Sequence, residues 1–512
     1  MFPDAIKYSN RFLLAFLIII CLLKLATLGL YPVMDSTEAR YADVGRMMLA
    51  GDDWITPRYP VQPDHPIGEP YLGKPPLSFW MTAFSFKIFG ISEFAARLPS
   101  FLNTVLSILM VFYFVRRFSD LRTAYFAAII LATTGLTNIM SGVVSTDISL
   151  AMAITLSATS FFLSLNAENR LRARIWGYAF FAGLGLSLLA KGPLGVVLTF
   201  IPIVLWTIIF REFKKVFFGI PWISGSILTL IIALPWYLLM ERDNPGYLKY
   251  FILDEHIYKY LKSDWKGDLY GNPHPQPIGT IWLFFLADTM PWLLVLLVAA
   301  YFVFKKKLHP ENFFKKQFIG YMILWMLAPP LFFTLCKNIQ LTYILYGIPA
   351  FAILTALAVN VALREQENLK PFNIFKTVPL SIFACAVPLL LTITSFTILP
   401  AIASKNSHKE IIDFIRKHDT EGETGIVYIK DRIPFSASFY SNGKVRNIVG
   451  MKEEINELFS SPDSHFIVVR KDNDFFKTFT AMPDRISNIG KVGSSYIFKT
   501  IPTSPAKKVP PL

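Results

Sequence analysis

Charged residues are scarce in this chain, and their scarcity excludes most classes of soluble protein. Asp, Glu, Lys and Arg make up 17% of the 512 residues and hydrophobic residues 53%, whereas about 25% is charged in an ordinary globular domain. A soluble protein of this length could not bury so much apolar surface. The composition also excludes a disordered or collagen-like chain. It predicts an integral membrane protein.

Cysteine is nearly absent, and several common motifs are missing. Cys21, Cys336 and Cys385 lie in or beside apolar segments and have no metal-ligand spacing, which excludes a disulfide framework and a cysteine zinc site. There is no P-loop and no G-x-G-x-x-G, so we expect no nucleotide cofactor. The net charge is +14, but no basic stripe with stacking aromatics occurs, so we expect no nucleic-acid partner.

Apolar runs are long enough to cross a bilayer at eleven places, since a spanning helix needs about 20 residues. The first, 12–33, lacks a clear cleavage site, so we interpret it as an uncleaved anchor. A weaker run at 77–91 is either interfacial or a twelfth span, and splitting the longer runs gives thirteen. We expect a mainly α, polytopic fold of about 11–13 spans. The other ten runs lie at 98–115, 123–141, 148–165, 175–190, 193–210, 217–239, 278–304, 318–336, 341–363 and 375–400.

Basic clusters fall at every second connection between these runs, and basic loops stay in the cytoplasm. This pattern predicts a cytoplasmic N-terminus and a periplasmic C-terminus. We therefore expect a transmembrane domain at 1–400, with periplasmic loops at 34–78 and 241–277. A small periplasmic α/β domain follows at 401–512. Its helix-like stretches are 408–418 and 452–459, and its strand-like runs are 425–429, 465–469 and 495–498.

The first periplasmic loop carries acids directly after the first span. Asp35 and Glu38 precede Tyr41 in a helical pattern that predicts an interfacial helix over 36–50, capped by Ser36 or Thr37. These acids either act on a substrate or merely start the helix. Lys74 stands before two prolines and is therefore held extended. It suits a phosphate as a fixed cation, or it simply snorkels.

Further polar residues are predicted on the same membrane face. Asp147 opens an apolar helix, where an acid is a functional candidate or a helix cap. The others are Arg40 near Asp35, Lys191 at a Lys-Gly-Pro break, Glu255 and His256 in the second loop, and Lys337 and Tyr343 near 340. His65, His256 and His274 with Glu69 and Glu255 could supply metal ligands, but no zinc-protease spacing supports this. The set suits a substrate with a lipid tail and a charged head.

These motifs, taken in order, resemble a known family. They are Asp35 to Ala42, the G-D-x-W-x-x-P element at 51–57, K-P-P-L at 74–77, Arg97-Leu98-Pro99, Asp147, Lys191-Gly192-Pro193, Glu255-His256 and Leu341-Thr342-Tyr343. Together they resemble bacterial membrane glycosyltransferases of the lipid A aminoarabinose transferase type, within the wider protein-mannosyltransferase-like group. The resemblance covers about 30–350.

The resemblance implies transfer of a sugar from a polyisoprenyl (undecaprenyl) phosphate carrier to a periplasmic lipid, glycan or protein acceptor in the bacterial inner membrane. It implies that Asp35, then Glu38, is the catalytic carboxylate and that Asp147 assists. It places Lys74, Arg40 and Lys191 at the donor phosphate, and Tyr41, Glu255, His256, Lys337 and Tyr343 at the substrates. The family's acid before the lysine is Gly73 here, which leaves a divalent metal at His256 open. Thr37 replaces another family acid, so aminoarabinose is not assumed.

Two other functions remain as alternatives. A lipid-linked sugar flippase or transporter would also have many spans, but its charges would lie on both faces, and transporters often contain internal repeats that this chain lacks. A non-catalytic envelope scaffold would tolerate loss of the first-loop acids. The sequence favours neither, and it predicts no particular oligomeric state.

Overall fold

The computed structural model describes residues 2–59, 68–262, 274–305, 313–369, 374–419, 424–429, 433–448, 452–461, 463–473, 475–480 and 485–501, with 265, 267, 269 and 270. The chain forms two compact units. The first comprises Met1–Leu28, Leu72–Met81 and Arg97–Thr394, and the second Gly29–Tyr71, Thr82–Ala96 and Ser395–Leu512.

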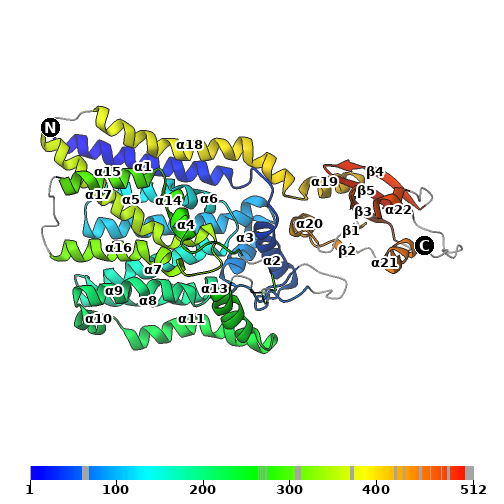
Figure 1. Cartoon of the computed structure of the whole chain (residues 1–512), viewed down its shortest axis with the longest axis horizontal. Coiled ribbons are helices and arrows are strands. Elements are labelled where there is room, and N and C mark those ends of the chain that lie inside the picture. Colours follow the sequence, from blue (N-terminus) through cyan, green and yellow to red (C-terminus); the bar gives the residue numbers. More distant parts are fainter. Residues whose placement is uncertain are drawn as a thin grey trace. The chain divides into compact units, whose positions relative to one another are not determined.

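Helices build the first unit (Figure 1). Three further helices, α3 (Leu77–Phe89), α4 (Glu93–Phe118) and α18 (Ile374–Lys405), contribute residues to both units. The helices of the first unit are α1 (Phe2–Thr27), α5 (Leu121–Thr133), α6 (Gly135–Met140), α7 (Thr146–Leu165), α8 (Arg170–Lys191), α9 (Leu194–Phe210), α10 (Phe213–Gly219), α11 (Trp222–Asp243), α12 (Tyr247–Lys249), the π-helix η1 (Tyr250–Tyr258), α13 (Lys259–Leu261), α14 (Thr280–Thr289), α15 (Trp292–Lys305), α16 (Phe313–Phe333), the 3-10 helix η2 (Leu341–Gly347) and α17 (Ile348–Leu369).

The polytopic helical fold is confirmed, because every predicted apolar run lies on a helix or a pair of helices. Within the described residues, seven helices are long and apolar enough to cross a membrane, or eight if a bent pair forms one span. Three shorter apolar helices, α3, α5 and α9, occupy other predicted runs. The run at 278–304 is not one straight helix: α14 and α15 meet at 86°.

Aromatic packing fills the centre of the first unit, where α7 contacts α8 and α9. The Phe162 ring lies 5.8 Å from that of Trp206 and 5.3 Å from that of Tyr321. Tyr321 and Trp206 are fully buried, and their polar atoms donate to the carbonyl oxygens of Ala158 and Gln317. Their burial is therefore achieved without unpaired donors.

The second unit contains α2 (Thr37–Gly51) and a five-stranded sheet in the order β2-β1-β3-β5-β4. The strands β1 (Gly425–Ile429), β2 (Val445–Ile448) and β3 (His465–Arg470) pair in parallel, whereas β4 (Ile486–Val492) and β5 (Ser495–Thr500) add antiparallel strands. The helices α19 (Lys409–His418), α20 (Phe435–Tyr440), α21 (Lys452–Ser460) and α22 (Phe475–Thr480) accompany the sheet. The predicted small α/β region is confirmed.

The predicted helix in the first loop is also confirmed, but its predicted cap is wrong. Ser36 occupies the N-cap position of α2 and makes no side-chain cap bond. Instead, Glu38 Oε2 accepts a hydrogen bond of 3.1 Å from the backbone N–H of Met34. A first-turn acid thus satisfies a free backbone donor just before the helix.

Candidate active site

The predicted site residues Asp147 and Lys191 form a buried ion pair in the first unit. Asp147 is at the start of α7, where its backbone N–H donates to Ser145 Oγ at 3.1 Å. Lys191 is the last residue of α8, and the packing of α7 on α8 brings the two together. The sequence singled out each residue but did not predict their pairing.

Two residues of η2 complete the surroundings of Asp147, and sequence reasoning assigned neither a role. Tyr346 donates its hydroxyl to Asp147 Oδ1 at 2.6 Å, and Thr342 donates to Oδ2 at 3.0 Å. The predicted residue Tyr343 lies beside them, with its ring 4.8 Å from Lys191 Nζ and stacked on Phe333. The Asp147 carboxylate therefore holds Lys191 against Thr342 and Tyr346 of η2.

A second cluster in the first unit centres on Glu255, in the π-helix η1. Lys74 Nζ contacts Glu255 Oε1 and donates to the carbonyl of its neighbour Gly73 at 2.7 Å. Lys259 lies 3.2 Å from Oε2. Burial raises the pKa of Glu255, but the two lysines outweigh it and lower that pKa to about 2. Two ammonium groups therefore lie beside one buried carboxylate.

His256 connects the two clusters. Its Nε2 lies 3.0 Å from the carbonyl oxygen of Lys191 and its Nδ1 2.7 Å from that of Phe251. Because both ring nitrogens face carbonyl oxygens, the ring has no nitrogen left for a metal. The described residues contain no group of three or more His, Cys, Asp or Glu that could hold one, and His65 lies outside them. Among the described residues, His256 therefore has no partners with which to hold a metal.

Lys337 connects the second loop to the residues before η2. Its backbone N–H donates to the carbonyl of Tyr260 at 3.0 Å, and its own carbonyl accepts from Gln276 at 3.2 Å. Among the described residues its ammonium has no ion-pair partner. Lys337 is therefore a further cation of the first unit, with its backbone fixed by two strand-like contacts.

The remaining predicted residues belong to the second unit, where Asp35 is bound to the α20 region. Its Oδ1 accepts from the backbone N–H of Ser436 at 3.0 Å, and its Oδ2 contacts the Ser436 hydroxyl. Its own N–H donates to the Asn406 carbonyl at 2.8 Å. Nothing in the sequence indicated a contact with a residue 401 positions away. These bonds orient the carboxylate.

Arg40 and Tyr41 form an aromatic cluster in the same unit. The Arg40 guanidinium lies 5.2 Å from the ring of Tyr41, 5.8 Å from that of Tyr71 and 5.9 Å from that of Phe435. Its Nη1 also donates to the Tyr59 hydroxyl at 3.4 Å. Cation–π contacts of this kind hold a guanidinium in place without neutralising its charge. Arg40 thus remains suited to an anionic partner.

Comparison with known proteins agrees with this arrangement. The family model of dolichyl-phosphate-mannose-protein mannosyltransferase matches residues 9–251. The chain is 30% identical over 340 residues to the undecaprenyl phosphate-alpha-4-amino-4-deoxy-L-arabinose arabinosyl transferase of Edwardsiella ictaluri, covering 66% of this chain and 57% of that protein. The identity to the same enzyme of Pseudomonas paraeruginosa is 28% over 341 residues, with 65% and 56% covered. The chain thus spans somewhat more than half the length of these curated relatives.

The fold is similar to that of a solved structure, ArnT from Cupriavidus metallidurans bound to undecaprenyl phosphate. The TM-score is 0.76 at 18% identity, over 96% of this chain and 98% of that one. The apolar helices and these relatives indicate a multi-pass bacterial inner-membrane protein. The resemblance predicted from the motifs is therefore confirmed, since the chain is similar in sequence to mannosyltransferase-type and aminoarabinose-transferase-type proteins and has the ArnT fold.

Proposed function

We propose that the chain is a membrane glycosyltransferase that moves a sugar from a polyisoprenyl phosphate carrier to a periplasmic acceptor. The proposed carrier is undecaprenyl phosphate. Lipid A or lipopolysaccharide is the favoured acceptor, with another glycan or a protein as the alternative. The observation that carries the proposal is the cluster of Lys74 and Lys259 around Glu255. The two ammonium groups that lie beside Glu255 suit a phosphodiester head group at the end of a lipid.

In the proposed reaction, an acceptor oxygen attacks the anomeric carbon of the sugar. The bond from that carbon to the carrier phosphate breaks, and polyisoprenyl phosphate leaves with the electron pair. Lys74 stabilises the charge that develops on the phosphate. Glu255 holds its ammonium in place, and the two prolines that follow Lys74 fix its backbone. Arg40 and Lys337 supply further positive charge, Asp147 holds Lys191 in place, and Tyr41, Tyr343 and His256 position the substrates.

Asp35 takes the proton if the acceptor group is a hydroxyl, and Glu38 is the second candidate. The hydrogen bonds from Ser436 support this assignment, because they orient the Asp35 carboxylate. If the acceptor group is a phosphate, no strong base is needed and Asp35 orients groups instead. The basic loops support a cytoplasmic N-terminus and a periplasmic C-terminus, which place this chemistry in the periplasm.

Mass spectrometry of envelope glycolipids tests the proposal in three strains: the intact gene, a deletion, and Asp35→Asn expressed at an equal level. We expect a sugar-sized mass on lipid A or its core to disappear in the deletion and in the Asp35→Asn strain. Loss in the deletion alone would remove Asp35 from the mechanism and turn attention to Glu38. If no glycolipid changes in any strain, a lipid acceptor is excluded. If protein glycosylation is also unchanged, the transferase proposal is overturned.

A further inference from the structure

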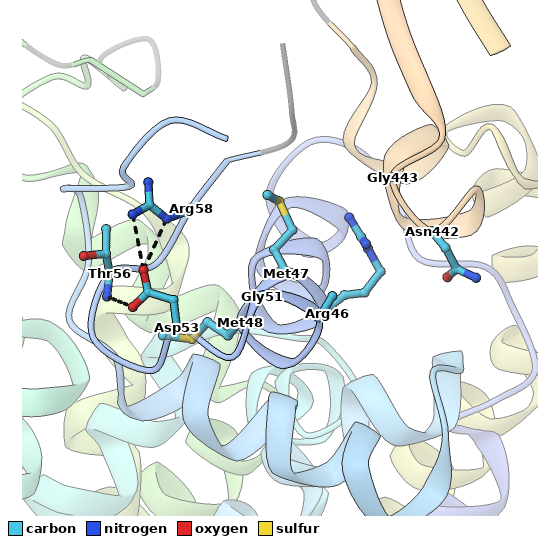
Figure 2. A pocket seen from close by; sticks show the side chains of 10 residues that line it. Arg46, Met47, Met48, Gly51, Asp53, Thr56, Arg58, Asn442 and Gly443 are labelled. Atoms are coloured by element: carbon cyan, nitrogen blue, oxygen red, sulfur yellow. Dashed lines mark hydrogen bonds and ion pairs between the residues drawn. The ribbon is translucent and has the colours of Figure 1, made fainter. Parts of the chain in front are cut away.

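A cavity of about 360 Å³ lies in the second unit, and none of the residues proposed for sugar transfer lines it. Its wall comes from the C-terminal half of α2, the loop that follows, and the turn between α20 and β2 (Figure 2). Two arginines, Arg46 and Arg58, contribute to it, together with Met47, Asn442 and Gly443. The cavity thus combines cationic, apolar and amide groups with the carboxylate of Asp53.

Arg46 is buried but incompletely paired. Its side chain is 7% exposed, and its Nε donates to Asp43 Oδ1 at 2.5 Å. Within the described part of the chain, Nη1 and Nη2 have no hydrogen-bond partner, and the buried Asp43 Oδ2 has none either. In the described chain, Asp43 Oδ2 is the atom of this pair that is buried without a partner, whereas the terminal nitrogens of Arg46 are not among such atoms. The guanidinium points toward the Gly443 turn (Figure 2), so its free edge is available to a ligand.

The turn between α20 and β2 leaves this edge open. Gly443 has φ +81°, and a Cβ placed there would lie 3.3 Å from Arg46 Nη2. Any other residue would be strained and would press on the guanidinium. The neighbouring Asn442 is exposed, and its amide has no hydrogen-bond partner among the residues that the structure describes. The turn therefore adds an unused amide beside the arginine.

Arg58 is held in a fixed orientation by Asp53. Its Nε and Nη2 both lie 3.3 Å from Asp53 Oδ2. The other oxygen of Asp53 accepts from the backbone N–H of Thr56 at 3.0 Å (Figure 2) and from that of Ile55 at 3.1 Å. Because both oxygens of Asp53 are already bonded, the carboxylate is fixed in place. Arg58 keeps donor capacity, because each terminal guanidinium nitrogen carries two hydrogens.

We propose that this cavity binds a phosphate monoester group, either on a lipid head group or as free phosphate. Planar guanidinium forks match phosphate oxygens in two-point contacts, and here two forks are oriented in advance by acids. The volume lies within the usual ligand-pocket range of about 300–1,000 Å³, which accommodates a phosphate together with part of the group that carries it. The site lies outside the transfer machinery, and the proposal does not depend on the proposed reaction.

The test measures binding to the full-length protein in nanodiscs of phosphatidylcholine, with no sugar donor present. The probes are dihexanoyl phosphatidic acid, dihexanoyl phosphatidylcholine and inorganic phosphate at constant ionic strength. Arg46→Gln removes the buried donor but leaves Asp43 unpaired. Asn442→Asp is therefore the second variant, since it adds a negative charge at an exposed position and Asp tolerates the left-handed backbone there. Asn488→Asp, at an exposed position in β4, is the matched control for charge.

We expect phosphatidic acid to bind and phosphatidylcholine not to bind. The Kd for phosphatidic acid should rise about tenfold in Asn442→Asp and in Arg46→Gln, as for the loss of one charge-assisted hydrogen bond. It should stay unchanged in Asn488→Asp. Equal binding of inorganic phosphate with the same sensitivity would support the site and identify free phosphate as its ligand. No binding of either phosphate probe, or binding equal in Asn442→Asp and Asn488→Asp, overturns the proposal.

Discussion

At the scale of single residues, the first unit pairs each of two acids with lysines in a buried setting. Asp147 is paired with Lys191, and Glu255 with Lys74 and Lys259. Pairs of this kind specify which side chains face one another, and removing one partner leaves a charge stranded away from water. Two predictions belong to this scale.

The first prediction concerns the acid stability of the Glu255 cluster. The pKa of Glu255 falls from its ordinary 4.5 to about 2 in the folded protein, so the unfolded chain takes up a proton first as the pH drops. The stability that Glu255 contributes is fully present above about pH 4.5 and is lost toward pH 2, to a maximum of about 3 kcal/mol. Thermal unfolding of the purified protein in detergent at several pH values checks this. The Glu255→Gln variant should show a weaker pH dependence between pH 5 and 2, and an unchanged dependence contradicts the assignment.

The second prediction concerns the coupling of Asp147 and Lys191. Asp147→Asn or Lys191→Met alone should lower stability by about 3–5 kcal/mol, because the partner is left buried and unpaired. The double variant should lose clearly less than the sum of the two, since it leaves no stranded charge. A double-mutant cycle by thermal unfolding measures the coupling. Strictly additive losses would show that the two side chains do not act as a pair.

At the scale of elements, the break between α8 and α9 is where the two clusters meet. Lys191 ends α8, Gly192 has φ +80°, and the π-helix η1 places His256 and Phe251 against this turn. A Cβ at Gly192 would lie 2.7 Å from the Phe251 ring and 3.1 Å from His256 Cε1. The glycine therefore serves both the backbone conformation and the close approach of η1.

This geometry gives a third prediction with an internal control. Gly192→Ala should lower stability more than Gly246→Ala. Both glycines have positive φ, but a Cβ at Gly246 would meet nothing within 4 Å. Gly192 (φ +80°, ψ −153°) also lies in a backbone region that is nearly confined to glycine, whereas Gly246 (φ +90°, ψ 0°) is left-handed helical, so the difference combines greater backbone strain with the contact with η1. Thermal unfolding of the two variants side by side tests this, and equal losses would exclude a tight η1 contact.

The lengths of the elements could be predicted better than their breaks. Apolar runs indicated where helices lie, because burial in lipid demands a continuous apolar surface. The 86° bend between α14 and α15 and the π-helical form of η1 could not be predicted, because they depend on packing against other helices. For the same reason the sequence nominated Asp147 and Lys191 as isolated functional candidates but gave no sign of Tyr346 as their partner.

At the scale of the whole molecule, the chain combines a helical membrane unit with an α/β unit. The strands β1, β3 and β5 coincide with the strand-like runs predicted from the sequence and are largely buried. The strands β2 and β4 were not predicted, since β2 has four residues and β4 interrupts its apolar residues with Ser, Asn, Gly and Lys. The contact of Asp35 with Ser436 could not be predicted from the sequence either, because it joins the first loop to a residue 401 positions away.

The fourth prediction concerns topology. Alkaline phosphatase, which is active only after export, should be active when fused after residue 501 and inactive when fused after Lys305, in a basic connection. Equal expression of the two fusions is the control. Activity of the Lys305 fusion together with inactivity of the C-terminal fusion would invert the orientation and place the proposed chemistry in the cytoplasm.

The most direct test of the central claim is the affinity of the full-length protein in nanodiscs for undecaprenyl phosphate. Lys74→Gln removes the proposed phosphate contact, Lys74→Arg keeps the charge beside Glu255, and Lys471→Gln is the control at an exposed position. If Lys74 holds the carrier phosphate, the Kd should rise about tenfold or more in Lys74→Gln, less in Lys74→Arg, and not at all in Lys471→Gln. An unchanged Kd in a correctly folded Lys74→Gln protein contradicts the account.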